Sequence, residues 1–173
     1  IKLLTFIEPT LPHLIGDPLR IKQIIHNLLS NAIKFTPEEG EVYFSVEMKS
    51  IKDGKAILDI SIQDNGKGIA KEHQELIFTP FSQSDNSITR NFGGTGLGLS
   101  ISKNLASLMN GSIFLKSDLG KGSTFIVTLI LDVEEESLEI NRYQNNGYKK
   151  IGIYKTFDYI ELMNMPNKIV IET

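Results

Sequence analysis

The chain has 173 residues, 40% of them hydrophobic, and a formal net charge of −3 at pH 7. This length supports one main domain with a sizeable core. The slight acidic excess disfavours a nucleic-acid partner, and the lack of cysteine excludes disulfides and thiolate metal sites, as suits a reducing compartment. No apolar run approaches the ~20 residues that span a bilayer, and no signal-peptide pattern is present. Because the sequence starts in mid-pattern at Ile1, we expect a piece of a longer protein.

The first predicted elements are a strand and a long helix. Residues 2–7 are apolar and β-prone and predict the strand. The helix is expected from Asp17 to Phe35, because Asp17 can accept from free N–H groups of the first turn and Pro18 suits the first helical position. Its apolar side, which we expect to face the core, holds Ile21, Ile24, Ile25, Leu28 and Ala32.

A polar stripe runs beside this apolar side. Asn27, Asn31 and Lys34 are spaced so that they fall within ~60° of one another around the helix. His26 precedes the stripe, and we expect it to be a partly buried structural residue. Neither His26 nor the other two histidines show the spacing of metal ligands.

Two β-hairpins follow from alternating apolar and polar residues. The first has strands at 41–48 and 56–63, and the second has strands at 112–116 and 123–131. With the first strand they predict an α+β fold, a two-layer α/β sandwich with a mixed five-stranded sheet covered on one face by helices.

Between the hairpins lies the stretch with the most distinctive composition. A turn, Asp64-Asn65-Gly66-Lys67-Gly68, leads into a short helix at 71–77, then Phe78-Thr79-Pro80-Phe81 and a long polar loop at 82–92. A loop of that length in a compact domain is often a lid or binding loop. We expect Phe78 and Phe81 to be structural, as core residues or anchors of the loop.

The glycine-rich stretch 93–98 runs directly into a second helix. Backbone N–H groups in such a stretch can approach a phosphate closely, and the helix dipole adds positive potential there. The spacing fits neither a P-loop nor a dinucleotide fingerprint. This helix is expected to end at Gly111 as its C-terminal cap. It should bury Leu99, Leu105, Leu108 and Met109.

In this order, the asparagine stripe, the Asp64 turn, the Phe78–Phe81 segment and the glycine stretch resemble four boxes of one family. They are similar to the N, G1, F and G2 boxes of the ATP-binding domain of sensor histidine kinases, in the superfamily of gyrase, heat-shock chaperone and mismatch-repair ATPases with the Bergerat ATP-binding fold. The resemblance covers residues 1–131. It implies ATP and Mg²⁺ as cofactors.

The resemblance assigns roles that agree with the chemistry of the residues. Asn31 and Asn27 would help to hold Mg²⁺, which takes few protein ligands. Lys34 would meet phosphate oxygens, and with Asn27 it is the expected catalytic pair. Asp64 would accept a hydrogen bond from the exocyclic amine of adenine. The expected nucleotide-binding residues are Asn27, Asn31, Lys34, Asp64, Gly66, Gly68, Ile69, Arg90, Gly94, Thr95, Gly96, Leu97, Gly98 and Thr124.

The position of Asn27 also bears on the reaction. Water-activating ATPases of the superfamily carry a glutamate there, one turn before the Mg²⁺ asparagine, and an asparagine cannot act as a general base. The resemblance therefore implies transfer of the γ-phosphoryl group to a histidine on a separate dimerisation domain. It further implies a downstream response regulator or receiver domain and a homodimeric full-length protein. It also implies a cytoplasmic location, either as a cytoplasmic protein or as the cytoplasmic part of a membrane-anchored sensor.

After residue 131 the composition changes. We expect residues 132–149 to be an acidic linker and 150–173 to be a short tail with strand-helix-strand character. The lid resembles that of hybrid sensor kinases, so the tail could be a truncated or degenerate start of a receiver domain. The segment Ile151–Thr156 lacks the acidic pair expected after a receiver's first strand.

Two alternatives on the same fold stay open at this point. One is a regulatory module that binds nucleotide without transferring phosphate. The other is a serine kinase of the anti-sigma type, whose acceptor is a separate protein serine. A gyrase-like ATPase ranks below both because of Asn27.

Overall fold

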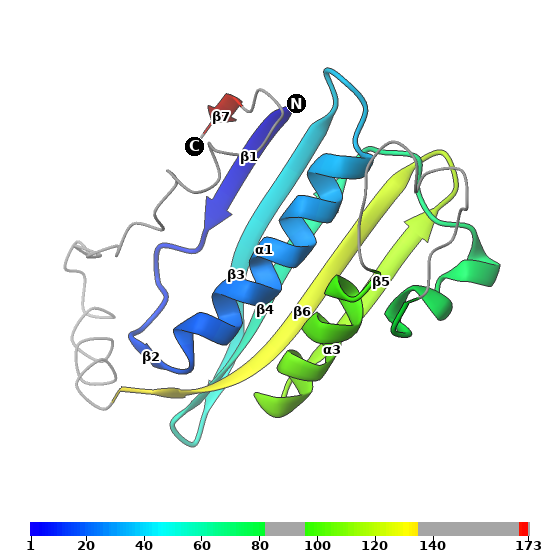
Figure 1. Ribbon diagram of the computed structural model, residues 1–173. Helices are drawn as coiled ribbons and strands as arrows, with labels where there is room; N and C mark the ends of the chain where they lie inside the picture. Colours follow the sequence, from blue (N-terminus) through cyan, green and yellow to red (C-terminus); the bar gives the residue numbers. More distant parts are fainter. Residues whose placement is uncertain (82–95, 135–169, 173) are drawn as a thin grey trace.

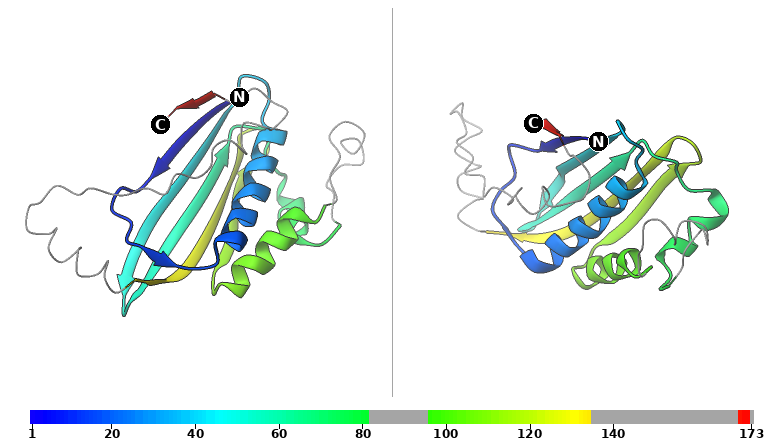
Figure 2. Two further views of the ribbon diagram at one scale, coloured as in Figure 1. Left: turned by 60° about the vertical axis from the view of Figure 1, so that its left-hand side comes forward. Right: turned by 45° about the horizontal axis from the view of Figure 1, so that its top comes forward.

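The computed structural model describes residues 1–81, 96–134 and 170–172. Within them, seven strands form one mixed sheet, and two α-helices cover one of its faces (Figures 1 and 2). The elements are β1 (Lys2–Ile7), β2 (Leu14–Ile15), α1 (Pro18–Phe35), β3 (Glu41–Lys52), β4 (Lys55–Asp64), the 3₁₀ turns η1 (Lys71–His73) and η2 (Leu76–Phe78), α3 (Gly98–Leu108), β5 (Ser112–Asp118), β6 (Gly122–Val133) and β7 (Val170–Glu172). The expected two-layer α+β architecture is confirmed.

The sheet is built around the antiparallel pair β4 and β6. The strand order is β2-β6-β4-β3-β1-β7, and β5 also pairs with β6. β3 and β4 form the first expected hairpin, and β5 and β6 form the second. β1 runs parallel to β3, which makes the sheet mixed.

Helix α1 begins and ends where its capping residues predict. Asp17 accepts hydrogen bonds from the backbone N–H groups of Leu19 and Arg20 at 3.0 and 3.1 Å. At the other end, Thr36 has extended backbone angles and its hydroxyl donates to the carbonyl of Ala32 at 2.6 Å. Both ends of the helix are therefore satisfied by local side chains.

The core lies between the sheet and the helices. Strand residues that alternate with polar ones are buried in this core, as with Ile60 and Ile62 on β4 and Val127 and Leu129 on β6. Of the apolar side predicted for α1, Ile21 is half-buried and the rest is buried, as are Leu29 and Ile33. The helix thus buries a broader apolar side than the sequence pattern alone indicated.

The second helix differs in detail from its expected burial. Leu108 is 66% exposed, so its expected place in the core was wrong, whereas Met109 is 8% exposed. Ser102 and Ala106 are buried instead, because small side chains let α3 lie close to α1. Asn110, rather than Gly111, adopts the left-handed conformation that ends the helix, while the Gly111 N–H reaches the Ala106 carbonyl at 2.8 Å.

The single short helix expected at 71–77 is instead two 3₁₀ turns, η1 and η2. The sheet also exceeds the expected five strands. The short β2 pairs with the end of β6, and β7 pairs in parallel with β1.

The last long strand of the sheet extends past residue 131. β6 continues to Val133, and Glu134 donates its N–H to the His13 carbonyl at 3.0 Å, so the sheet includes residues expected in the acidic linker. Residues 135–169 lie outside the described residues. Val170–Glu172 join the edge of the main sheet rather than a separate unit. Neither described helix has both the length and the apolar character needed to cross a bilayer.

The packing of α1 gives a first testable prediction. Leu28 is fully buried, so Leu28→Ala should leave a cavity and lower the free energy of unfolding by about 2–5 kcal/mol. Leu19, on the same helix, is 77% exposed, and Leu19→Ala should change it by about 0.5 kcal/mol or less. Urea denaturation followed by circular dichroism measures both. Equal losses in the two variants would contradict this account of the core.

Candidate functional site

Asn27 joins the two helices at the start of α3. Its Nδ2 donates to the Gly98 carbonyl at 3.1 Å and to the Ser102 hydroxyl oxygen at 3.2 Å. Both N–H donors of the amide are therefore used, and Oδ1 remains as an acceptor. The asparagine stripe and the end of the glycine stretch, 71 residues apart in sequence, thus meet in one place.

Asn31 and Lys34 lie further along the same helix, and both are half-buried. Within the part of the chain that the structure describes, the Asn31 side chain makes no hydrogen bond. The Lys34 Nζ lies 5.1 Å from the centre of the Phe35 ring, and the Lys67 Nζ lies 5.5 Å from the same ring. Two ammonium groups therefore gather where α1 ends beside the turn after β4.

Asp64 is the last residue of β4 and is 6% exposed. Its Oδ1 accepts from the Gly66 N–H at 2.9 Å, and the Ser123 N–H also bonds the carboxylate. Burial raises the pKa of Asp64, and these two backbone N–H groups oppose the rise by stabilising the charged form. Asp64 is therefore a buried carboxylate held in place by backbone donors.

Three glycines allow the backbone to pack tightly around Asp64. A Cβ on Gly66 would overlap the Phe35 carbonyl, and one on Gly68 would overlap the Asp118 carbonyl. Gly122 has φ of +92°, and a Cβ there would overlap the carbonyl of Asp64. Gly66 and Gly68 are among the predicted nucleotide-binding residues, and that role stays a prediction. In the structure they also let this turn fit between α1 and the β5–β6 hairpin.

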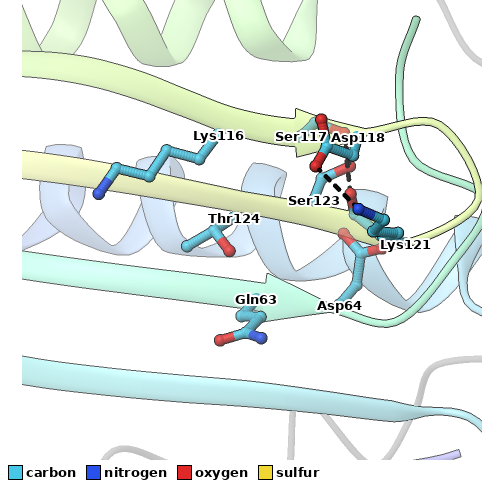
Figure 3. A pocket seen from close by; sticks show the side chains of 9 residues that line it. Gln63, Asp64, Lys116, Ser117, Asp118, Lys121, Ser123 and Thr124 are labelled. Atoms are coloured by element: carbon cyan, nitrogen blue, oxygen red, sulfur yellow. Dashed lines mark hydrogen bonds and ion pairs between the residues drawn. The ribbon is translucent and has the colours of Figure 1, made fainter.

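Ser123, rather than Thr124, lies on the Asp64 side of the sheet. Ser123 is directly opposite Asp64 in the β4–β6 pairing and is 6% exposed. Thr124 is the next residue along β6 and points to the opposite face, and a pocket of about 300 Å³ at this end of the sheet is lined by Thr124 and also by Asp64 and Ser123 (Figure 3). The nucleotide-binding role of Thr124 stays a prediction, and Ser123, which the sequence analysis did not single out, is the residue that faces Asp64.

The described part of the glycine stretch shapes the start of α3. Gly96 has φ of +68°, Leu97 is the N-terminal cap position, and Gly98 lies against the Asn27 side chain. Among the residues that the structure describes, no side chain caps this helix. Its first N–H groups are therefore not occupied by a capping side chain. The predicted residues Arg90, Gly94 and Thr95 lie outside the described residues.

Phe78 is packed against the core, whereas Phe81 and His26 are exposed. Phe78 packs edge-to-face on Phe125 with ring centres 6.4 Å apart, which confirms its structural role. Phe81 is 75% exposed and does not contribute to the core. His26 is exposed, so its expected partial burial was wrong. Among the described residues, no cluster of three or more His, Asp or Glu could hold a metal ion.

Residues 16–133 match the family model described as "Histidine kinase-, DNA gyrase B-, and HSP90-like ATPase". The chain belongs to this family. Curated relatives include histidine protein kinase 1 of Candida albicans, 44% identical over 75% of this chain, and the sensor histidine kinase GacS of Pseudomonas protegens, 46% identical over 73% of it. The matched parts are only 5% and 14% of those two proteins. The family's ATP-binding catalytic domain is thus present here.

Solved structures of the family support the same assignment. Full-length ShkA in complex with AMPPNP superposes with a TM-score of 0.63 and 30% identity, over 77% of this chain and 26% of that one. The catalytic domain of the histidine kinase ThkA superposes with a TM-score of 0.60 and 28% identity, over 75% of this chain and 79% of that one.

The raised pKa of Asp64 gives a second prediction. The folded chain binds the Asp64 proton more readily than the unfolded chain does, so this group lowers stability as pH rises through the window between the two pKa values. The melting temperature of Asp64→Asn relative to the native chain should therefore increase as the pH rises above the ordinary Asp pKa of 3.8, and it should level off once Asp64 is also ionised in the folded chain. Differential scanning fluorimetry without nucleotide measures this difference.

The control variant is Asp53→Asn, which removes a carboxylate at an exposed turn. It corrects for the loss of one negative charge. A difference between Asp64→Asn and native chain that stays flat or falls with rising pH would contradict the burial argument.

Proposed function

We propose that this chain is the catalytic ATP-binding domain of a sensor or hybrid histidine kinase, and that it transfers the γ-phosphoryl group of Mg-ATP to a histidine on a separate dimerisation domain. The observation that carries the proposal is the contact of Asn27 with Gly98 and Ser102. It brings an amide-lined helix to the start of α3, which no side chain in the described part of the chain caps. Amide oxygens and free N–H groups at one place are suited to a metal-bound triphosphate.

The residues of the site fit a magnesium ion. The Asn27 Nδ2 already donates two hydrogen bonds, which leaves Oδ1 as the acceptor that could bind a metal. Among the described residues, the Asn31 side chain makes no hydrogen bond. Both supply neutral oxygen donors, which Mg²⁺ accepts alongside water and phosphate oxygens. When bound, Mg²⁺ would neutralise part of the phosphate charge and polarise the transferred group. Asn31 and Asn27 are the residues that would hold it.

Adenine recognition is assigned to Asp64. Its carboxylate is fixed by the N–H groups of Gly66 and Ser123, so it would meet the exocyclic amine of adenine without rearrangement. Lys34 and Lys67, near the end of α1, supply positive charge for phosphate oxygens. The loop residues Gly94, Thr95 and Arg90 are proposed to complete the phosphate side.

The absence of a carboxylate general base on α1 favours transfer over hydrolysis. The helix from Pro18 to Phe35 contains no Asp or Glu, and Asn27 stands where a water-activating glutamate would be needed. A domain without that base accelerates phosphoryl transfer mainly by positioning the reactants and neutralising charge. The nucleophile is then expected on another domain. We assign that role to the partner histidine, with a response regulator or receiver domain downstream, a dimeric full-length protein and a cytoplasmic location.

Isothermal titration calorimetry tests the assigned metal ligand. Asn31→Ala should weaken Mg-ATP binding by about tenfold or more, and it should change ATP binding in EDTA much less, because the lost oxygen serves the metal. Gln23→Ala, on an exposed part of the same helix, is the matched control. The metal assignment fails if Asn31→Ala weakens both titrations equally. The nucleotide assignment fails if the folded native chain binds neither form.

Transfer is tested by mixing the chain with γ-labelled ATP and the histidine-bearing dimerisation domain of a related kinase. We expect acid-labile, base-stable label on the added domain and little on the chain itself. Replacing the acceptor histidine by alanine should abolish the label. Acid-stable label on serine would instead support the anti-sigma type of kinase, and binding without any transfer would support the regulatory module.

A further inference from the structure

Ile69 is held at both of its backbone polar groups by side chains. Its N–H donates to the Ser117 hydroxyl at 2.8 Å, and its carbonyl accepts from Gln74 Nε2 at 2.9 Å. Ile69 ends the turn that begins at Asp64. The peptide groups that close this turn are therefore set by two residues, one on β5 and one just after η1.

Ser117 also ties this turn to the strand that holds Asp64. Its hydroxyl donates to the Gly122 carbonyl at 2.8 Å and lies 3.0 Å from the Ser123 hydroxyl (Figure 3). Because Ser117 has one hydroxyl proton, already given to Gly122, the Ser123 hydroxyl must be the donor in the second contact. Ser123 in turn provides a backbone N–H to Asp64. One hydroxyl thus links Ile69 to the environment of the proposed adenine-binding carboxylate.

Gln74 closes the same junction from the other side. Its Nε2 donates to the Ser117 carbonyl as well as to the Ile69 carbonyl, both at 2.9 Å, so its two N–H groups are fully used. The Gly120 N–H adds a bond to the Lys67 carbonyl at 2.7 Å. Three segments far apart in sequence, the turn after β4, the β5–β6 hairpin and the residues after η1, form one hydrogen-bonded unit.

We propose that Ser117 and Gln74 are positioning residues of the nucleotide site, which hold the Asp64–Ile69 turn in its binding conformation before nucleotide arrives. The proposal rests on the nucleotide-binding function proposed above. If only a fraction of the molecules has the turn in its binding conformation, the apparent affinity for nucleotide falls by that fraction. A turn that is already held in this conformation avoids that loss. Neither side chain needs to touch the nucleotide for this effect.

The variants Ser117→Ala and Gln74→Met test the proposal in the full chain. Each removes hydrogen bonds to Ile69, and each should raise the Kd for ADP by about fivefold or more. The factor should be the same for Mg-ATP, because the turn serves the base rather than the phosphates. Ser107→Ala, which removes an exposed hydroxyl bond within α3, is the matched control and should leave both Kd values unchanged.

Two readouts separate positioning from general stabilisation. Hydrogen exchange of nucleotide-free chain should show faster exchange of the Ile69 amide in both variants, with α1 and β4 still protected. In the double variant, the loss of affinity should be smaller than the product of the two single losses, because both residues hold the same residue. All titrations are made well below the melting temperature of each variant, so that only folded chain is compared.

The outcomes are distinct. If the folded native chain binds no ADP, the proposed function is refuted. Native binding with unchanged Kd in both variants overturns the positioning role while leaving that function intact, even if the variants melt earlier. Losses that multiply in the double variant would also contradict the shared hold on Ile69.

Discussion

The register between β4 and β6 is the constraint on which the rest of the structure depends. Ten residue pairs run without a bulge from Lys55 opposite Asp132 to Asp64 opposite Ser123. This pairing places every second side chain of both strands against the helices and so builds the core. The same register brings a backbone N–H of β6 to the carboxylate at the end of β4. Core packing and the proposed adenine contact are therefore parts of one pairing.

The two helices meet through polar rather than purely apolar contacts. Ser102 is fully buried, and its hydroxyl lies between the Gly98 carbonyl and the Asn27 amide. Buried polar groups are tolerated when their hydrogen bonds are satisfied, and they then favour one particular arrangement. Here that arrangement is the approach of α1 to the start of α3. The apolar residues alone would allow α3 to slide along α1 at lower cost.

Some features of the site oppose stability. Asp64 is buried, and its raised pKa shows that the folded state disfavours the charged form. The turn after it uses glycines where a side chain would collide with the Phe35 or Asp118 carbonyl. Proteins commonly accept such local costs where a ligand is recognised. The surrounding core and the hydrogen bonds of Ser117 and Gln74 maintain this arrangement.

The sequence by itself determined the two long helices, the two hairpins and the motifs typical of the family. Local signals, such as the Asp17 cap and the period of two in the hairpins, depend on neighbouring residues and can be read without a fold. What only the tertiary structure decided depends on distant partners. A period of two places Ser123 in step with Phe125 and Asp64 in step with Ile62, each on the apolar face of its strand, but only the pairing of β6 with β4 puts the two residues opposite one another. Likewise, the hold of Ser117 on Ile69 spans 48 residues and has no sequence signature, since it arises from how the hairpin packs against the turn.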